Sequence, residues 1–199
     1  MSEDAMAATK AEAPTARPEV ATPGDAPADA SAAIDERIAR AWAVLDGVLD
    51  PEVPVVSVVD LGIVRAVSDD GESLSVVVTP TYSGCPATEV IAASIVAALD
   101  EAGLGPTRIV MQRAPAWTSD WISDEGKARL RGYGIVPPGP VDLATGAPLR
   151  FVPRAVAPLA CPRCDSIDTE RLAAFGATAC KALWRCRACG EPFEHFKAI

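Results

Sequence analysis

Long apolar runs, aromatic residues, histidine and positive charge are all scarce in this sequence of 199 residues. No stretch approaches the roughly 18 consecutive apolar residues of a transmembrane helix, so we expect no membrane-spanning segment. The first ten residues, MSEDAMAATK, contain neither a basic nor an apolar segment and do not predict a secretory signal. Histidine occurs once, at His195, near the end of the chain. The residues before it therefore offer no imidazole as a general base for a nucleophilic thiol.

The deficit of positive charge bears on the partners of the protein. There are 18 lysine and arginine residues against 27 aspartate and glutamate residues, giving a formal net charge of -9. An acidic surface repels phosphate backbones, which counts against a nucleic-acid partner. With no export signal we expect a cytoplasmic protein. In that reducing compartment the six cysteines favour metal binding or thiolate chemistry over disulfides.

Two segments lack the large apolar residues that a folded core requires. Residues 1–33 contain twelve alanines and four prolines but no aromatic residue, and we expect a disordered, acidic tail. Residues 137–160 contain six prolines and are expected to form a linker. Two folded units remain, a domain at 34–136 and a cysteine-rich module at 161–199.

The pattern in residues 34–136 predicts a compact α/β (α+β) domain with the element order αββαβα. Apolar residues at helical spacing predict a first helix between Ile34 and Val48. Two β-type runs follow, and the Asp-Gly pair between them favours a hairpin. The expected strands are at 63–68, 73–79 and 107–112, and the other expected helices are at 86–102 and 123–133.

This element order predicts where a functional site would lie. A helical crossover should make the second and third strands of the small three-stranded sheet parallel. The entrance of the first strand and the exits of the other two then meet at one edge, where α/β sheets place their sites. The segments expected there are 50–62, 79–86 and 114–121. Trp117 and Trp121 in the last of these segments could equally be core residues.

Cys85 is the first candidate functional residue at this edge. It directly precedes Pro86, and because proline favours the first helical position, Cys85 is expected to cap the second helix. The positive end of a helix favours a thiolate, which would make Cys85 a nucleophile or a soft-metal ligand. Glu52 and Asp60 are candidate partners, although their negative charges would raise the pKa of the thiol. The alternatives are a small buried cysteine at 85 and a turn-forming aspartate at 60.

The last forty residues contain a second candidate site made of two C-x-x-C turns. Cys161 and Cys164 form the first turn and Cys186 and Cys189 the second, with 21 residues between the turns. Four thiolates at this spacing predict one tetrahedral metal site, a structural zinc in a small zinc-ribbon-like β module. An iron–sulfur cluster on the same thiolates stays open as an alternative. A fifth thiol, Cys180, is either a buried apolar residue or an alternative ligand.

Three motifs in the first domain carry a family resemblance. They are Asp50-Pro51-Glu52-x-Pro54, Asp60-Leu61-Gly62 with Val64, and Thr79-x5-Cys85-Pro86. Together they resemble the metal–sulfur cluster assembly family that includes the SufT-type proteins, over roughly residues 34–136. The strings at 79–88, 115–121, 175–184 and 191–198 are more closely similar to one branch, the PaaD-like family of the phenylacetyl-CoA epoxidase system.

The resemblance implies a function as well as a fold. It implies an accessory, non-catalytic protein in aerobic phenylacetate degradation that helps to mature the iron–sulfur or iron centres of the epoxidase. Cys85 would be the functional thiol, with Glu52 and Asp60 beside a labile iron–sulfur cluster or iron. The partners would be the other epoxidase subunits, including the iron–sulfur reductase subunit. A structural or electron-transfer subunit, and a thiol-dependent enzyme acting through Cys85, are the alternatives.

Overall fold

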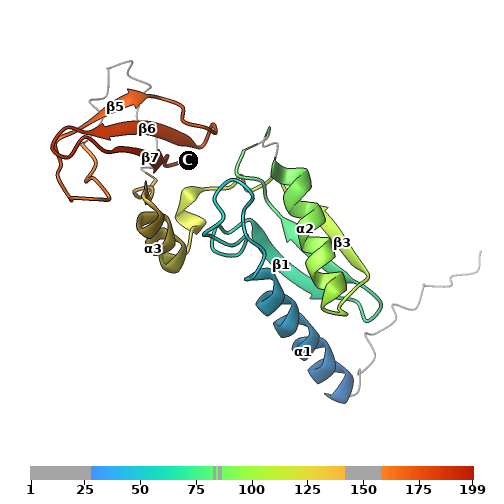
Figure 1. Cartoon of the computed structure of the whole chain (residues 1–199). Helices are drawn as coiled ribbons and strands as arrows, with labels where there is room; N and C mark the ends of the chain where they lie inside the picture. The colour runs from blue at the N-terminus through green and yellow to red at the C-terminus, as the bar shows by residue number, and fades with distance from the viewer. Residues whose placement is uncertain (1–27, 83, 85–86, 142–157) are drawn as a thin grey trace, which may run out of the picture.

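The computed structural model describes residues 28–82, 84, 87–141 and 158–199. These residues form a three-stranded sheet, in the order β1-β2-β3, and a four-stranded sheet, in the order β4-β7-β6-β5 (Figure 1). The helices are α1 (Ala28–Leu45), α2 (Ala87–Glu101) and α3 (Asp124–Tyr133), with a 3-10 turn η1 (Ser119–Trp121). The strands are β1 (Val64–Asp69), β2 (Leu74–Val78), β3 (Thr107–Met111), β4 (Ile135–Val136), β5 (Thr169–Ala173), β6 (Lys181–Cys186) and β7 (Pro192–Phe196).

Strands β1 and β2 form the expected hairpin. They pair antiparallel, and Gly71 in the turn takes a φ of 89°, a conformation that L side chains rarely adopt. The Asp70 carboxylate accepts hydrogen bonds from the N–H groups of Glu72 and Ser73 at 3.0 and 2.7 Å. The Asp-Gly pair therefore specifies this turn through both its backbone freedom and its side-chain hydrogen bonds.

Strands β2 and β3 are parallel, as the crossover through α2 predicts. Helix α1 packs against β1 and α2, and α2 packs against β3. The core between sheet and helices contains Leu74, Val76 and Val78 of β2 and Ile91, Ile95 and Leu99 of α2, all buried. Burying each such side chain stabilises the fold by about 1.5–3 kcal/mol, so this contact holds the crossover in place.

Helix α1 begins at Ala28, six residues before the position predicted from its apolar periodicity. The predicted tail at 1–33 is therefore wrong for its last six residues, and residues 1–27 lie outside the described part of the chain. The added turns have the sequence Ala-Asp-Ala-Ser-Ala-Ala, and alanine has the highest helix propensity. High helix propensity therefore extends α1 beyond its amphipathic part.

The second sheet includes a strand that the sequence did not predict. Strand β4 belongs to the expected first domain, yet it pairs in parallel with β7 through Ile135↔Glu194 and Val136↔His195. The boundary expected after residue 136 therefore falls at the end of a strand of the second sheet. Residues 142–157 of the expected linker lie outside the described residues.

The module and the first domain also share a hydrophobic core. Cys180 and Phe196 are 7% and 2% exposed and belong to the core cluster of the first domain. The rings of Phe196 and Trp117 have centroids 6.1 Å apart. The Ser119 N–H donates to the carbonyl of Ile199 at 3.1 Å. The two units are thus packed together rather than joined only by the chain.

Across the described residues, no helix combines the length and apolarity that a membrane crossing requires.

Candidate functional site

The two C-x-x-C turns of the module have the same local structure. In each, the residue after the second cysteine donates its N–H to the carbonyl of the first: Asp165 to Cys161 and Gly190 to Cys186, both at 2.9 Å. Asp165 and Gly190 take φ values of 56° and 80°. A left-handed residue at this position turns the chain back over its own cysteines, so both thiols of each turn point to one side.

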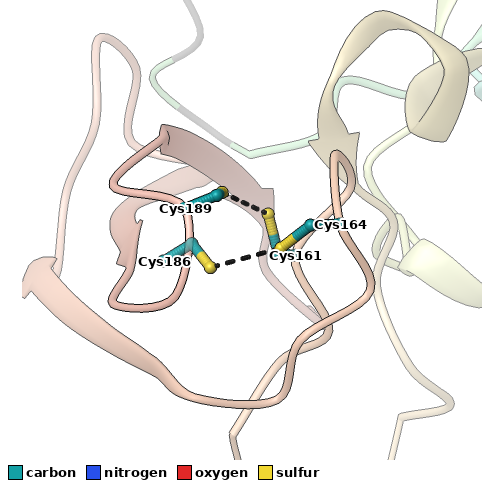
Figure 2. Close-up of side chains that lie close together, drawn as sticks. All are labelled: Cys161, Cys164, Cys186 and Cys189. Atoms are coloured by element: carbon teal, nitrogen blue, oxygen red, sulfur yellow. Dashed lines mark hydrogen bonds between the residues drawn. The ribbon is translucent and has the colours of Figure 1, made fainter.

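The two turns face each other and bring four thiols together (Figure 2). The sulfurs of Cys161 and Cys189 are 3.8 Å apart, and those of Cys164 and Cys186 are 3.6 Å apart. All four lie within 4.8 Å of one another. Four sulfurs bound tetrahedrally at a Zn–S distance of about 2.3 Å would lie about 3.8 Å apart. The geometry therefore fits one metal ion held by four thiolates, as the spacing predicted.

The four thiols also affect one another's protonation. The N–H of Cys189 stabilises the Cys186 thiolate, and the pKa of Cys186 falls to about 7. At Cys164 the hydrogen bond from the Ser166 N–H also lowers the pKa. The neighbouring thiols together outweigh this effect and raise the pKa of Cys164 to about 12. Four sulfurs this close cannot all be ionised without a cation, because thiolates repel one another. A bound dication would stabilise all four charges.

The expected convergence of loops at the edge of the first sheet is present. Val78, at the end of β2, pairs with Val64 at the start of β1 and with Met111 at the end of β3. The segments before β1, after β2 and after β3 therefore leave the sheet at one edge, as the topology predicted. Cys85 lies outside the described residues, so its predicted place at the helix end stays a prediction.

A small cavity lies at this edge, between the first domain and the module. It is lined by Asp50, Glu52, Val53, Leu61, Ile63, Val78, Pro80, Thr81, Thr88, Ile91, Cys180 and Phe196. We call it the edge cavity. The centre of a water-sized sphere can occupy about 20 Å³ of this cavity. That volume is enough for one or two water molecules or ions. Its polar lining consists of two carboxylates, one thiol and two hydroxyls.

Asp50 and Glu52, which line the edge cavity, belong to the Asp-Pro-Glu motif. The Asp50 carboxylate accepts hydrogen bonds from the N–H groups of Glu52 and Val53 at 2.9 and 2.8 Å, which holds the loop in a tight turn. Burial nevertheless raises the pKa of Asp50, which is 7% exposed. Burial and the negative charge of Asp50 also raise the pKa of Glu52. Asp50 is therefore poorly solvated, whereas Glu52 is half-buried.

Asp60 does not line the edge cavity and has a different role. Its carboxylate accepts hydrogen bonds from the Ser57 N–H and the Ser123 hydroxyl, both at 3.0 Å, and pairs with the Arg129 guanidinium. These contacts tie the loop before β1 to the start of α3. The structure thus brings Glu52 to the cavity but places Asp60 in a structural network, in line with the turn-forming alternative.

Replacing Asp60 with asparagine should lower the free energy of unfolding by about 1–3 kcal/mol, because it weakens buried, charge-assisted hydrogen bonds. Denaturant unfolding of the purified chain measures this loss. Glu72→Gln, at an exposed turn residue, is the control and should stay within about 0.5 kcal/mol of the wild type. Unchanged stability in Asp60→Asn would contradict the structural role.

Trp117 and Trp121 occupy structural positions near the same edge. Trp117 is 4% exposed, and its Nε1–H donates to the carbonyl of Leu61 at 2.9 Å. The guanidinium of Arg65 lies 3.7 Å from the centre of the Trp121 ring, a cation–π contact. Trp117 therefore holds the segment after β3 against the loop before β1, and Trp121, which is partly buried, packs against β1 and the core.

Sequence reasoning missed two residues of the edge cavity. Asp50 was included only as part of a motif, and Cys180 was discussed only as a fifth thiol of the module. The string at 175–184, which carried part of the resemblance, was the available signal for Cys180. Its approach to the first domain is a tertiary contact that spacing within the module does not indicate.

Comparisons with known proteins find a separate family model for each unit of the chain. The family model described as iron-sulfur cluster assembly protein matches residues 38–109, and the one described as PaaD zinc beta ribbon domain matches residues 146–197. A protein of Escherichia coli strain K12, described as a subunit of 1,2-phenylacetyl-CoA epoxidase, is 45% identical over 158 residues. The match covers 79% of this chain and 91% of that protein.

Comparison with solved structures also finds matches to part of the chain. A domain of unknown function, DUF59, from Bacillus anthracis is 24% identical, covers 50% of this chain and 96% of its own, and has a TM-score of 0.47. The protein Rv1466 from Mycobacterium tuberculosis, described as associated with iron–sulfur complex assembly and repair, is 32% identical. It covers 59% of this chain and 98% of its own, with a TM-score of 0.29.

Proposed function

Because the chain belongs to the PaaD family of 1,2-phenylacetyl-CoA epoxidase subunits, we propose that it is an accessory protein that matures the iron–sulfur or iron centres of that system. One observation carries the proposal. The domain matched by the iron–sulfur cluster assembly model places the carboxylates of Asp50 and Glu52 at a cavity on its sheet edge, and the module adds the thiol of Cys180. Such a donor set suits the transient binding of iron more than the oxidation of an organic substrate.

The two candidate sites would have different roles in this function. The four thiols of the module would hold a structural zinc, because a closed four-ligand site leaves no position for a substrate. Cys85, together with the edge cavity and Glu52, would be the site that carries iron or a labile iron–sulfur cluster. The partners would be the other epoxidase subunits, including the iron–sulfur reductase subunit, in the cytoplasm.

Two alternatives make different chemical demands on the same structure. An electron-transfer subunit needs a redox-active centre, and zinc held by four thiolates is redox-silent. An enzyme acting through Cys85 needs a base, and the single histidine belongs to β7 of the module, where it packs edge-on against Trp184. A non-redox structural subunit of the epoxidase complex is the remaining competitor.

Deleting the whole chain from a phenylacetate-degrading cell should lower both the iron content of the epoxidase system and its activity by about tenfold or more, as loss of metal support commonly does. The measurement is iron per protein and substrate turnover for the epoxidase subunits purified anaerobically, with and without the chain supplied from a plasmid. Fully loaded centres in an inactive epoxidase would instead favour the structural subunit.

A further inference from the structure

We propose that a second pocket, at the same edge of the first sheet, binds a small organic carboxylate that carries an aromatic ring. We call it the arginine pocket. Its polar groups come from Thr79 and Arg113, and its apolar wall includes Pro80, Tyr82, Ala116 and Trp117. The existence of the site does not depend on the proposed function. The choice of phenylacetate as the acid to test rests on it.

Thr79 gives the pocket a hydroxyl group without a partner. The residue directly follows β2, is 1% exposed, and donates its N–H to the carbonyl of Ile63 at 2.8 Å. Within the described part of the chain, its hydroxyl oxygen has no hydrogen-bond partner. Such a group destabilises the fold, and native structures rarely retain one without a bound water or ligand. Because Thr79 lines the arginine pocket, an oxygen atom of a bound molecule can supply the missing partner.

Arg113 gives the pocket its charge. Its side chain is exposed, and among the residues that the structure describes its guanidinium forms no salt bridge. No aspartate or glutamate among the described residues lines the pocket. A free guanidinium is therefore present beside an unpartnered hydroxyl, in a chain whose formal net charge is -9. Guanidinium groups bind carboxylates through charge-assisted hydrogen bonds, so this pair of groups favours a carboxylate ligand.

The size and the wall of the pocket indicate the rest of the ligand. Its volume is about 210 Å³. An apolar cavity of about 150 Å³ is enough to hold benzene, so the arginine pocket has room for one ring and a short acidic group. The rings of Tyr82 and Trp117 offer apolar contact surface to such a ring. The Trp117 ring is held in place because its Nε1–H donates to the carbonyl of Leu61 at 2.9 Å.

The arginine pocket is next to the edge cavity, because Pro80 and Thr81 line both. These two residues begin the segment that leads to Cys85. Ile199 of the module also lines the arginine pocket, and its carbonyl accepts a hydrogen bond from the Ser119 N–H at 3.1 Å. A ligand in this pocket would therefore contact both the segment that leads to the candidate thiol and the end of the module.

Titration of the zinc-loaded full chain with phenylacetate tests the pocket. Ligand-observed NMR should show one site with a Kd on the order of 0.1–1 mM, the range expected for a ligand of about ten non-hydrogen atoms. Arg113→Gln should weaken binding by about tenfold or more, because it removes the charged partner of the carboxylate. Phenylethanol, which lacks the charge, and acetate, which lacks the ring, should each bind about tenfold more weakly or worse.

Thr79→Val separates a role in binding from a role in the fold. Valine has nearly the shape of threonine but no hydroxyl. Because the hydroxyl has no partner in the described structure, the free energy of unfolding should stay equal or rise, while phenylacetate binding should weaken by about threefold or more. Arg108→Gln is the matched control for Arg113→Gln. Arg108 is also exposed, but it bonds to Ser75 at 2.8 Å and does not line the pocket, so the variant should bind like the wild type.

The possible outcomes are distinct from those of the proposed function. The site would be overturned by the absence of saturable phenylacetate binding at about ten times the expected Kd. Unchanged affinity in both Arg113→Gln and Thr79→Val, or equal binding of acetate, would also overturn it. If Thr79→Val does not fold, the exposed Arg113→Gln variant decides the question. Normal iron content of the epoxidase in cells that lack the chain would contradict the proposed function, but it would leave binding to the purified chain intact.

Discussion

Replacing Cys161 with serine should release the metal ion of the module and unfold the second sheet. A tetrahedral site with three thiolates binds zinc far more weakly, and the apparent binding free energy of structural zinc in small modules is about 10–16 kcal/mol. The module's own core cluster is small, consisting of Val136, Cys161, Ala182, Trp184, Cys186 and Phe193. Such a core cannot hold forty residues folded without the ion.

The same substitution should also destabilise the first domain. Phe196 and Cys180 fill part of that domain's core, and β4 would lose its pairing with β7. An unfolded module would expose Trp117 and the edge cavity, so the loss of stability would extend from the module into the first domain. Two independent domains would instead leave the first one unchanged.

Metal analysis and hydrogen exchange measure the two effects. Zinc or iron bound to the purified chain should fall from about one equivalent to near zero in Cys161→Ser. Amide exchange in β2 should become faster, because the opening free energy of the core falls. Cys180→Ser is the matched control and should keep the metal of the module. Metal loss in that variant would place Cys180 in the four-cysteine site, and a wild-type chain without zinc or iron would contradict the site itself.

The elements that sequence reasoning predicted are those fixed by local chemistry. The hairpin depends on Gly71 and Asp70 within four residues, and the two metal-binding turns depend on hydrogen bonds that span five residues each. The parallel crossover follows from chirality once the helix and strands are recognised. The start of α1 was misplaced because apolar periodicity does not report a helical turn made of alanines.

Features that depend on contacts between distant segments could not be predicted in this way. Strand β4 has two residues and exists through pairing with residues about sixty positions later. The role of Asp60 depends on Arg129, which the motif does not contain. The place of Cys180 depends on how the module packs against the first domain. In each case the surroundings of the residue depend on the tertiary structure, because its partners lie far away in the sequence.

Replacing Cys85 with alanine should remove the function while leaving the fold and the zinc content unchanged. Thr81 and Thr88, on either side of Cys85 in the chain, both line the edge cavity. A single thiol cannot hold a four-thiolate cluster, so the carrier must draw on further donors. These further donors would come from the same chain, from a second chain or from the client protein.

Epoxidation of phenylacetyl-CoA in cells carrying Cys85→Ala should fall by about tenfold or more, the scale expected when a metal-supporting group is lost. The iron content of the epoxidase subunits should fall in parallel, because the variant cannot deliver what it cannot hold. Ser94→Ala, farther along α2, is a matched control and should support normal growth on phenylacetate. Full growth with Cys85→Ala would show that this cysteine is only a packing residue. Failed growth with fully loaded centres would place the chain inside the epoxidase complex, because the defect would then lie in assembly or catalysis rather than in metal delivery.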